Sequence, residues 1–274
     1  MYTPPTISDD TKPLTLTDFV RMKAEGENIA CLTAYDASFG ALVDRAGVDF
    51  VLVGDSLGMV IQGHDTTVPV TIDDMIYHTN CVSRALRRGF LVADMPFLSF
   101  ATNEHALASA AGLLQEGGAK MVKLEGGAEQ ADVVEYLAIR GISICAHLGL
   151  TPQHVHKLGG FRVQGKSDSE ADRMVAEAKI LESAGADIVL LECVPSALAA
   201  RVTEELTVPV IGIGAGPDVS GQILVLYDIL GVSPGRKPRF AHNFLAGRSN
   251  IEEAVTAYVA AVKDGSYPAD EHCY

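Results

Sequence analysis

The sequence predicts an α/β fold in which parallel strands alternate with helices. Two observations predict it: short, near-continuous apolar runs recur along the chain, and segments with helical spacing of Ala, Leu, Glu and Lys lie between them. The alternation allows an open doubly wound sheet or a closed barrel, and roughly eight runs favour the barrel. Because the 274 residues contain no linker-like stretch, we expect residues 1–274 to form a single (β/α)8 TIM barrel domain.

The predicted strands show little alternation of apolar and polar residues, as expected of parallel strands covered on both faces. In chain order they cover residues 28–36, 49–56, 90–97, 119–127, 142–150, 187–194 and 208–216, with a weaker run at 222–231. The clearest helices lie over 103–118 and 169–185, each ending in glycine. An amphipathic N-terminal helix with a Thr cap over 15–27 could close the bottom of the barrel. The polar stretch from Gly159 to Asp172 is predicted as a mobile lid or a plain surface loop.

Composition argues against several functions. With 21 basic and 35 acidic residues the net charge is −14, which disfavours binding to nucleic acid or to an anionic membrane. No apolar run approaches the roughly 18 residues of a membrane span, and residues 1–13 do not resemble a signal peptide, so we expect a cytoplasmic protein. The cysteines form no C-x-x-C pair and predict neither zinc nor disulfides: Cys31, Cys81, Cys145, Cys193 and Cys273.

Charged and polar residues follow the predicted strands where each apolar run ends. They are Asp55 and Ser56, then Asp94, Lys123 and Glu125, His147, Glu192, and the turn containing Gly214 and Gly216. In a barrel the carboxyl ends of all strands meet on one face, which carries the active site in enzymes of this fold. The sequence therefore predicts that these side chains form one site.

The carboxylates in this cluster favour a hard metal ion. Carboxylates at short range raise one another's pKa unless a cation lies between them. Oxygen ligands without a Cys or His pair suit Mg²⁺, which commonly takes one or two protein carboxylates and otherwise water and substrate. Asp55 and Asp94 fit this role, and Glu125 could bind the ion directly or hold a metal-bound water.

Each member of the cluster also has a structural alternative. Asp55 could cap the following helix, and Asp94 could belong to a turn. Lys123 and Glu125 are two apart on a strand, so they point to the same side and could form a structural ion pair. His147 taken alone is more often a core histidine than a catalyst.

Glu192 is the hardest residue to explain structurally, because a carboxylate that enters an apolar run is costly unless it is paired or functional. Two other features are weaker. His154 and His156 have a metal-like spacing that occurs often by chance. The glycines of residues 212–216 could place backbone amides at a phosphate or let a ligand approach the backbone.

At these residues the sequence resembles the ketopantoate hydroxymethyltransferase (3-methyl-2-oxobutanoate hydroxymethyltransferase) family, from about Thr33 to about Glu271. The resemblance is carried by ordered blocks that include TAYDASFG, VGDSLGMVIQGHDTTVPVT, ADMPF, VKLEGG, HLGLTPQ, GGFRVQG, LECVP, PVIGIGAG and GQILV. It implies a barrel of the phosphoenolpyruvate/pyruvate type. It also implies transfer of a hydroxymethyl group from methylenetetrahydrofolate to 3-methyl-2-oxobutanoate (α-ketoisovalerate), giving 2-dehydropantoate (ketopantoate) in pantothenate and coenzyme A biosynthesis.

The resemblance further implies roles for individual residues. Asp55 and Asp94 match the metal ligands of the family, with Glu125 close to a Mg²⁺ ion. The residues implied at the substrate are Asp55, Ser56, Asp94, Lys123 and His147, and Glu192 matches the proton acceptor. The family also suggests a homo-oligomer, a decamer.

The chemistry agrees with this assignment. The substrate must lose a proton from its tertiary β carbon, and Mg²⁺ can stabilise the resulting enolate as a Lewis acid. Glu192 can act as the base if partial burial keeps its pKa from being too low. Two alternatives remain: a Mg²⁺-dependent carbon–carbon lyase of the isocitrate lyase-like barrels, which usually has a loop cysteine that residues 159–166 lack, and a non-catalytic binding barrel.

Overall fold

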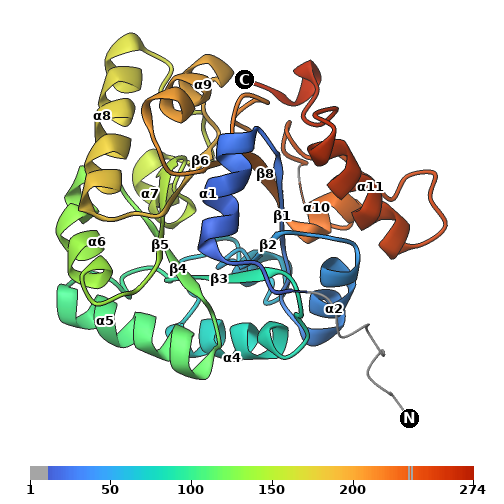
Figure 1. The fold of residues 1–274 in the computed structure, drawn as a ribbon, viewed down its shortest axis with the longest axis horizontal. Coiled ribbons are helices and arrows are strands. Elements are labelled where there is room, and N and C mark those ends of the chain that lie inside the picture. Colours follow the sequence, from blue (N-terminus) through green and yellow to red (C-terminus); the bar gives the residue numbers. More distant parts are fainter. Residues whose placement is uncertain (1–11, 234, 236) are drawn as a thin grey trace.

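The computed structural model describes residues 12–233, 235 and 237–274, and its centre is a closed barrel of parallel strands (Figure 1). The strands are β1 (Ile29–Thr33), β2 (Phe50–Val53), β3 (Phe90–Asp94), β4 (Met121–Glu125), β5 (Ile144–Gly149), β6 (Ile188–Glu192), β7 (Val210–Ile213) and β8 (Gly221–Leu224). Each strand pairs with the next, and β8 pairs with β1, so the prediction of a barrel is confirmed and the open sheet is wrong.

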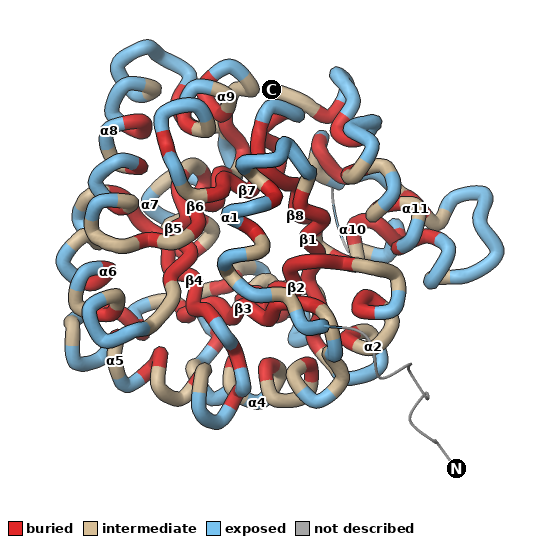
Figure 2. The backbone as a smooth tube through the Cα atoms, viewed as in Figure 1, coloured by how far each residue is buried: buried red, intermediate tan, exposed pale blue. Residues whose placement is uncertain are grey.

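Helices surround the barrel and connect its strands (Figure 1). They are α1 (Leu16–Glu25), α2 (Ala37–Arg45), α3 (Leu57–Val60), α4 (Ile72–Ser83), α5 (Asn103–Ala111), α6 (Ala131–Ala138), α7 (Val155–Leu158), α8 (Asp168–Ala184), α9 (Ser196–Glu205), α10 (Leu226–Leu230) and α11 (Ile251–Lys263). Short turns of other helix types lie at Gly112–Glu116, Ala128–Gln130, Pro152–His154 and Asp270–His272. Nearly every strand residue is buried, which explains why the apolar runs do not alternate (Figure 2).

The N-terminal helix α1 covers the bottom of the barrel, as predicted. Its start is fixed by the Asp18 carboxylate, which accepts hydrogen bonds from the backbone amide and hydroxyl of Thr15. The buried ring of Phe19 packs edge-on against Phe50 and Phe90, at the N-terminal ends of β2 and β3. Lys23 donates to three backbone carbonyls between residues 203 and 208, so the helix is held on both sides of the barrel axis.

Two predicted elements differ from the structure. The weak run at 222–231 is a strand only to Leu224, and α10 begins at Leu226, whose amide donates to the Thr33 hydroxyl. The polar stretch 159–172 is a loop only as far as Ser167, because the Ser167 hydroxyl accepts from the amide of Glu170 and thereby caps α8. Residues 168–172 are therefore helical.

All five cysteines are free, and Cys31, Cys145 and Cys193 are buried. Among the described residues, no helix combines the length and apolarity needed to span a bilayer. Residues 1–11, on which the expectation about a signal peptide mostly rests, lie outside the described part of the chain.

Candidate active site

The strand register brings the predicted side chains together at the C-terminal mouth of the barrel. Asp94 on β3 pairs with Lys123 on β4, and Glu125 pairs with His147 on β5. Glu192 ends β6 opposite Gly149. The side chains of Asp55, Asp94, Lys123, Glu125 and His147 are all almost fully buried.

Asp94 connects two other members of this cluster through its carboxylate oxygens. One of its oxygens accepts a hydrogen bond from the Lys123 ammonium, and Oδ2 accepts from the backbone amide of Asp55 at 3.0 Å. The approach depends on Gly54, where a Cβ would lie 3.3 Å from Asp94 Oδ2 and only 2.9 Å from the Ser56 hydroxyl. The turn after β2 is thus a close approach of backbone to side chain, and Asp55 belongs to the site as well as to the turn.

Gln153 is a site residue that the sequence did not reveal. Its backbone amide donates to Glu125 Oε2 at 3.0 Å, while its side-chain amide donates to Asp55 Oδ2 and to the carbonyl of Met95, both at 2.9 Å. It therefore links the ends of β2, β3 and β4. It lies in the block HLGLTPQ, but a neutral glutamine in a turn gave no signal of this role.

Three carboxylates face a single ammonium in this buried space. Burial raises the pKa of Asp55 well above its usual range, and the Asp94 and Glu125 carboxylates raise it further. Burial likewise raises the pKa of Glu125 to about 8, although Lys123 opposes the shift. Burial alone would lower the pKa of Lys123, but the three carboxylates outweigh it and raise that pKa. The cluster would accept one more positive charge.

The donor set fits a Mg²⁺ ion held by few protein ligands. Within the described residues, no three His, Cys, Asp or Glu side chains are grouped as a ready-made metal site. Asp55 and Asp94 supply two carboxylates, a usual number for Mg²⁺. In addition, Glu125 Oε1 is buried without a hydrogen-bond partner among the described residues, as expected of an atom that awaits a ligand.

His147 and Glu192 form the other half of the mouth. His147 Nε2 lies 3.3 Å from Glu192 Oε2, and its Nδ1 lies 3.5 Å from Glu125 Oε1. Neither approach has hydrogen-bond geometry, so within the described part of the chain both ring nitrogens are without a partner. Burial raises the pKa of Glu192, partly offset by His147, and the 16% exposure of its side chain leaves it accessible to a substrate. Burial, followed by Lys123, lowers the pKa of His147.

Ser56 lies beside this cluster, where its hydroxyl and the buried Tyr35 hydroxyl are 2.9 Å apart. The weaker candidates have other roles. His154 Nδ1 lies 2.9 Å from the hydroxyl of Thr151, and His156 is exposed. At Gly214 a Cβ would meet the rings of Phe240 and Tyr274, so this glycine makes room for the chain's own side chains.

Comparison with known proteins agrees with this geometry. Residues 13–270 match the family model of ketopantoate hydroxymethyltransferase. The 3-methyl-2-oxobutanoate hydroxymethyltransferase of Alkalilimnicola ehrlichii is 58% identical over 263 residues, which are 96% of this chain and 95% of that protein. The enzyme of the same name from Halorhodospira halophila is 59% identical over 251 residues, or 92% and 91% of the two chains.

Solved structures share the fold at low identity. A putative phosphonomutase from Burkholderia cenocepacia superposes with a TM-score of 0.61 at 16% identity, over 79% of this chain and 95% of that one. A 2,3-dimethylmalate lyase, described as a member of the PEP mutase/isocitrate lyase superfamily, gives 0.56 at 16% identity over 77% and 81%. The expected barrel type is therefore confirmed. Since the family model spans nearly the whole chain, the protein belongs to the ketopantoate hydroxymethyltransferase family of enzymes.

Proposed function

We propose that this enzyme transfers a hydroxymethyl group from methylenetetrahydrofolate to 3-methyl-2-oxobutanoate, forming 2-dehydropantoate for pantothenate biosynthesis. The observation that carries the proposal is the division of the mouth into two parts. A buried lysine lies among carboxylates on one side, and a partly exposed carboxylate, Glu192, lies on the other. The first part suits the anionic end of a ketoacid, and the second suits a base at its β carbon.

Lys123 and Ser56 are the residues proposed to bind the ketoacid. The raised pKa of Lys123 keeps its ammonium charged, so it can pair with the substrate carboxylate in a strongly acidic protein. Ser56 supplies a hydroxyl at the same mouth and is oriented by Tyr35. His147 adds two unpaired ring nitrogens that a bound substrate or water can satisfy.

Asp55 and Asp94 are the proposed ligands of Mg²⁺, with Glu125 close to the ion. When bound, the ion would supply Lewis-acid polarisation of the substrate's ketone and so favour loss of the β proton. The chain's own contribution is to hold the two carboxylates in place, through the Asp55 amide on Asp94 and the Gln153 amide on Asp55.

Glu192 is proposed to take the proton from the β carbon. Its raised pKa brings the carboxylate closer to the neutral range in which a base is most effective. His147 Nε2 lies 3.3 Å from Glu192 Oε2, so the base has a buried imidazole as its neighbour. The enolate carbon then bonds to the methylene carbon of the folate as one carbon–nitrogen bond of that carbon breaks. Water displaces the second nitrogen and leaves the hydroxyl on the carbon, and the two nitrogens of tetrahydrofolate take up the β proton and one proton of the water.

Family membership favours this transfer over the carbon–carbon lyase of the related barrels. We also propose that residues 1–274 form one domain, and that the protein is a cytoplasmic homo-oligomer, a decamer as the family resemblance implies. The oligomeric state can be measured by light scattering on the purified protein.

The first test is hydrogen exchange at the β carbon of 3-methyl-2-oxobutanoate in D₂O, followed by NMR with and without Mg²⁺ and without folate. Exchange that requires Mg²⁺ is the expected result. Formation of 2-dehydropantoate after addition of methylenetetrahydrofolate would then identify the acceptor reaction. Absence of both exchange and product would contradict the proposal, and cleavage of a 2-hydroxy or 2-oxo diacid instead would favour the lyase.

A further inference from the structure

The residue directly after Glu192 has a strained backbone. Cys193 has a φ of 49°, and it is one of only two non-glycine residues with positive φ among the described residues. This conformation is unfavourable for residues other than glycine and persists only where the surroundings enforce it. The direction of the Glu192 side chain therefore depends on the contacts that stabilise the turn at Cys193.

Backbone hydrogen bonds hold the turn from two directions. The Cys193 amide donates to the carbonyl of Ile213 at 2.9 Å, and its own carbonyl accepts from Gln164 at 2.9 Å. Val194 donates to the carbonyl of Gly214 at 3.2 Å. The strained turn is thus tied to the end of β7 and to the loop before α8.

Tyr274 supplies a third support, from a remote part of the chain. Its carbonyl accepts from the Ser196 amide at 3.1 Å, which fixes it at the start of α9. Its ring lies on Gly214, where a Cβ would come within 3.1 Å of Cε2. The guanidinium carbon of Arg239 lies 5.6 Å from the ring centroid, and Arg239 also donates to the carbonyl of Glu271.

The phenol also lies beside the turn itself. The buried Cys193 thiol has a raised pKa, mainly because burial penalises the thiolate and also because Glu192 is nearby, whereas contact with the Tyr274 hydroxyl opposes the shift. Burial raises the pKa of Tyr274 as well, with contributions from Cys193 and Glu192. The aromatic side chain of Tyr274 thus lies beside the glycine to which the turn is hydrogen-bonded.

We propose that Tyr274 is a positioning residue for Glu192: its ring, packed beside Gly214, whose carbonyl accepts from the amide of Val194, keeps the strained turn in the conformation that aims the carboxylate at the substrate. The inference rests on the proposed function, because it takes Glu192 as the base. The effective part of Tyr274 is its ring, since the ring edge lies beside Gly214, together with the ring of Phe240.

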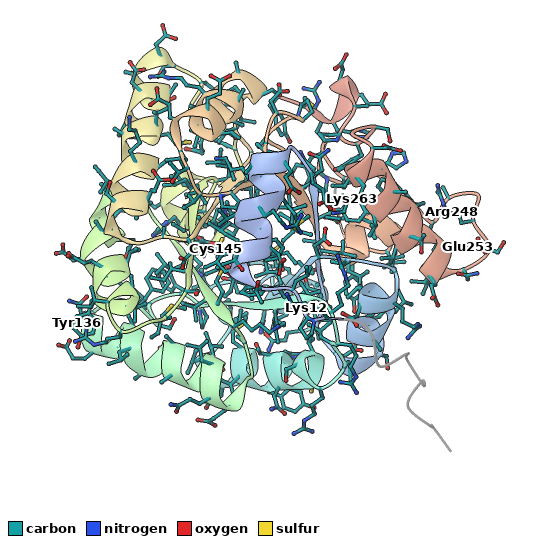
Figure 3. The ribbon with its side chains drawn as sticks, in the orientation of Figure 1. Lys12, Tyr136, Cys145, Arg248, Glu253 and Lys263 are labelled. Carbon is teal, nitrogen blue, oxygen red and sulfur yellow. The ribbon has the colours of Figure 1, made fainter. Side chains whose placement is uncertain are left out.

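The test compares Tyr274→Ala, Tyr274→Phe and the matched control Tyr136→Ala in the Mg²⁺-dependent exchange assay. Tyr136 is also a partly exposed tyrosine with a cation over its ring, but it lies on the outer side of α6 (Figure 3). Tyr274→Ala should lower kcat about 10- to 100-fold, the range in which a small misplacement of a catalytic group acts, with the KM for the ketoacid little changed. Tyr274→Phe should retain nearly full kcat, and Tyr136→Ala should not differ from wild type.

Cys193→Gly tests the same turn independently, in case Tyr274→Ala folds poorly. Glycine adopts positive φ without strain and also leaves it freely, so this variant should stay folded and lose kcat. Unchanged kcat in correctly folded Tyr274→Ala or Cys193→Gly would overturn the inference, as would an equal loss in Tyr274→Phe. Failure of the proposed function gives a different result, since wild-type protein would then show no exchange at all.

Discussion

Asp49 and Asp55 lie at opposite ends of the same barrel strand and are both almost fully buried. At the closed end, Asp49 Oδ1 accepts from Arg88 at 2.6 Å, and Oδ2 lies 2.6 Å from Lys263 and accepts from the amide of Ala30. At the open end, Asp55 accepts a single neutral hydrogen bond through Oδ2, from Gln153, and its charged neighbours include two carboxylates.

The same contrast holds for other buried polar groups at the two ends of the barrel. Asp44, also at the closed end, accepts from the backbone amides of Arg87, Arg88 and Gly89. At the mouth, Glu125 Oε1 and both nitrogens of His147 are buried without partners within the described chain. Since buried polar groups are nearly always satisfied, this contrast favours a stabilising role for the closed end and a ligand-binding role for the mouth.

The strongest way to test the functional end is Glu192→Gln. The amide keeps the shape of the side chain but cannot accept the β proton, so exchange at the ketoacid should slow about 100-fold or more. Affinity for the ketoacid and for Mg²⁺ should stay close to wild type, measured by calorimetric titration. Wild-type exchange in this variant would remove Glu192 from the role of base.

Asp55→Asn should separate activity from stability. Turnover should fall at least about 100-fold, because a proposed metal ligand is lost. The free energy of unfolding of the metal-free protein should be unchanged or higher, since one of three crowded carboxylates disappears. Chemical denaturation in EDTA and a Mg²⁺ titration of turnover provide the two readouts. A marked loss of stability with full activity would place Asp55 with Asp49 as a structural residue.

Asp49→Asn should behave in the opposite way. It leaves Arg88 without its anion and Lys263 with Glu27 alone, and removal of one partner from a buried pair costs about 3 kcal/mol. Denaturant unfolding should show this loss, while kcat per folded molecule stays at the wild-type value. The contrast between the two ends would fail if Asp49→Asn were as stable as wild type.

The pH dependence of exchange should report the environment of Glu192. A base must be deprotonated, so the rate should fall about tenfold per pH unit below its pKa. Because burial raises that pKa above the usual 4.5, the decline should begin at a higher pH than for an exposed glutamate. In Glu192→Gln the residual rate should lack this decline. An unshifted profile in wild type would mean that the carboxylate is fully hydrated in solution.

The sequence predicts those site residues that can be recognised from one strand and the residues next to it. A carboxylate that ends an apolar run can be recognised from neighbouring residues alone, and the barrel brings Asp94 and Glu192 to one face, as predicted. Gln153 could not be recognised, because its role depends on contacts with three other strands that exist only after the barrel closes. The end of β8 at Leu224 likewise depends on a distant partner, the Thr33 hydroxyl.

The strained backbone at Cys193 could not be predicted from the sequence either. Nothing in the letters around Cys193 marks a positive φ, since glycine, the residue most often found there, is absent. The conformation arises from β7, the loop before α8 and Tyr274, which approach the turn from separate parts of the chain.

The covering of the barrel floor by α1 has a consequence for the order of events during turnover. With Phe19 and Met22 packed across the bottom, the ketoacid and the folate of the proposed reaction would both have to enter at the mouth. The ketoacid is the smaller molecule and is proposed to bind beside the deep Lys123, so a folate seated first would block its path. We therefore expect sequential kinetics in which the ketoacid enters first and its product leaves last.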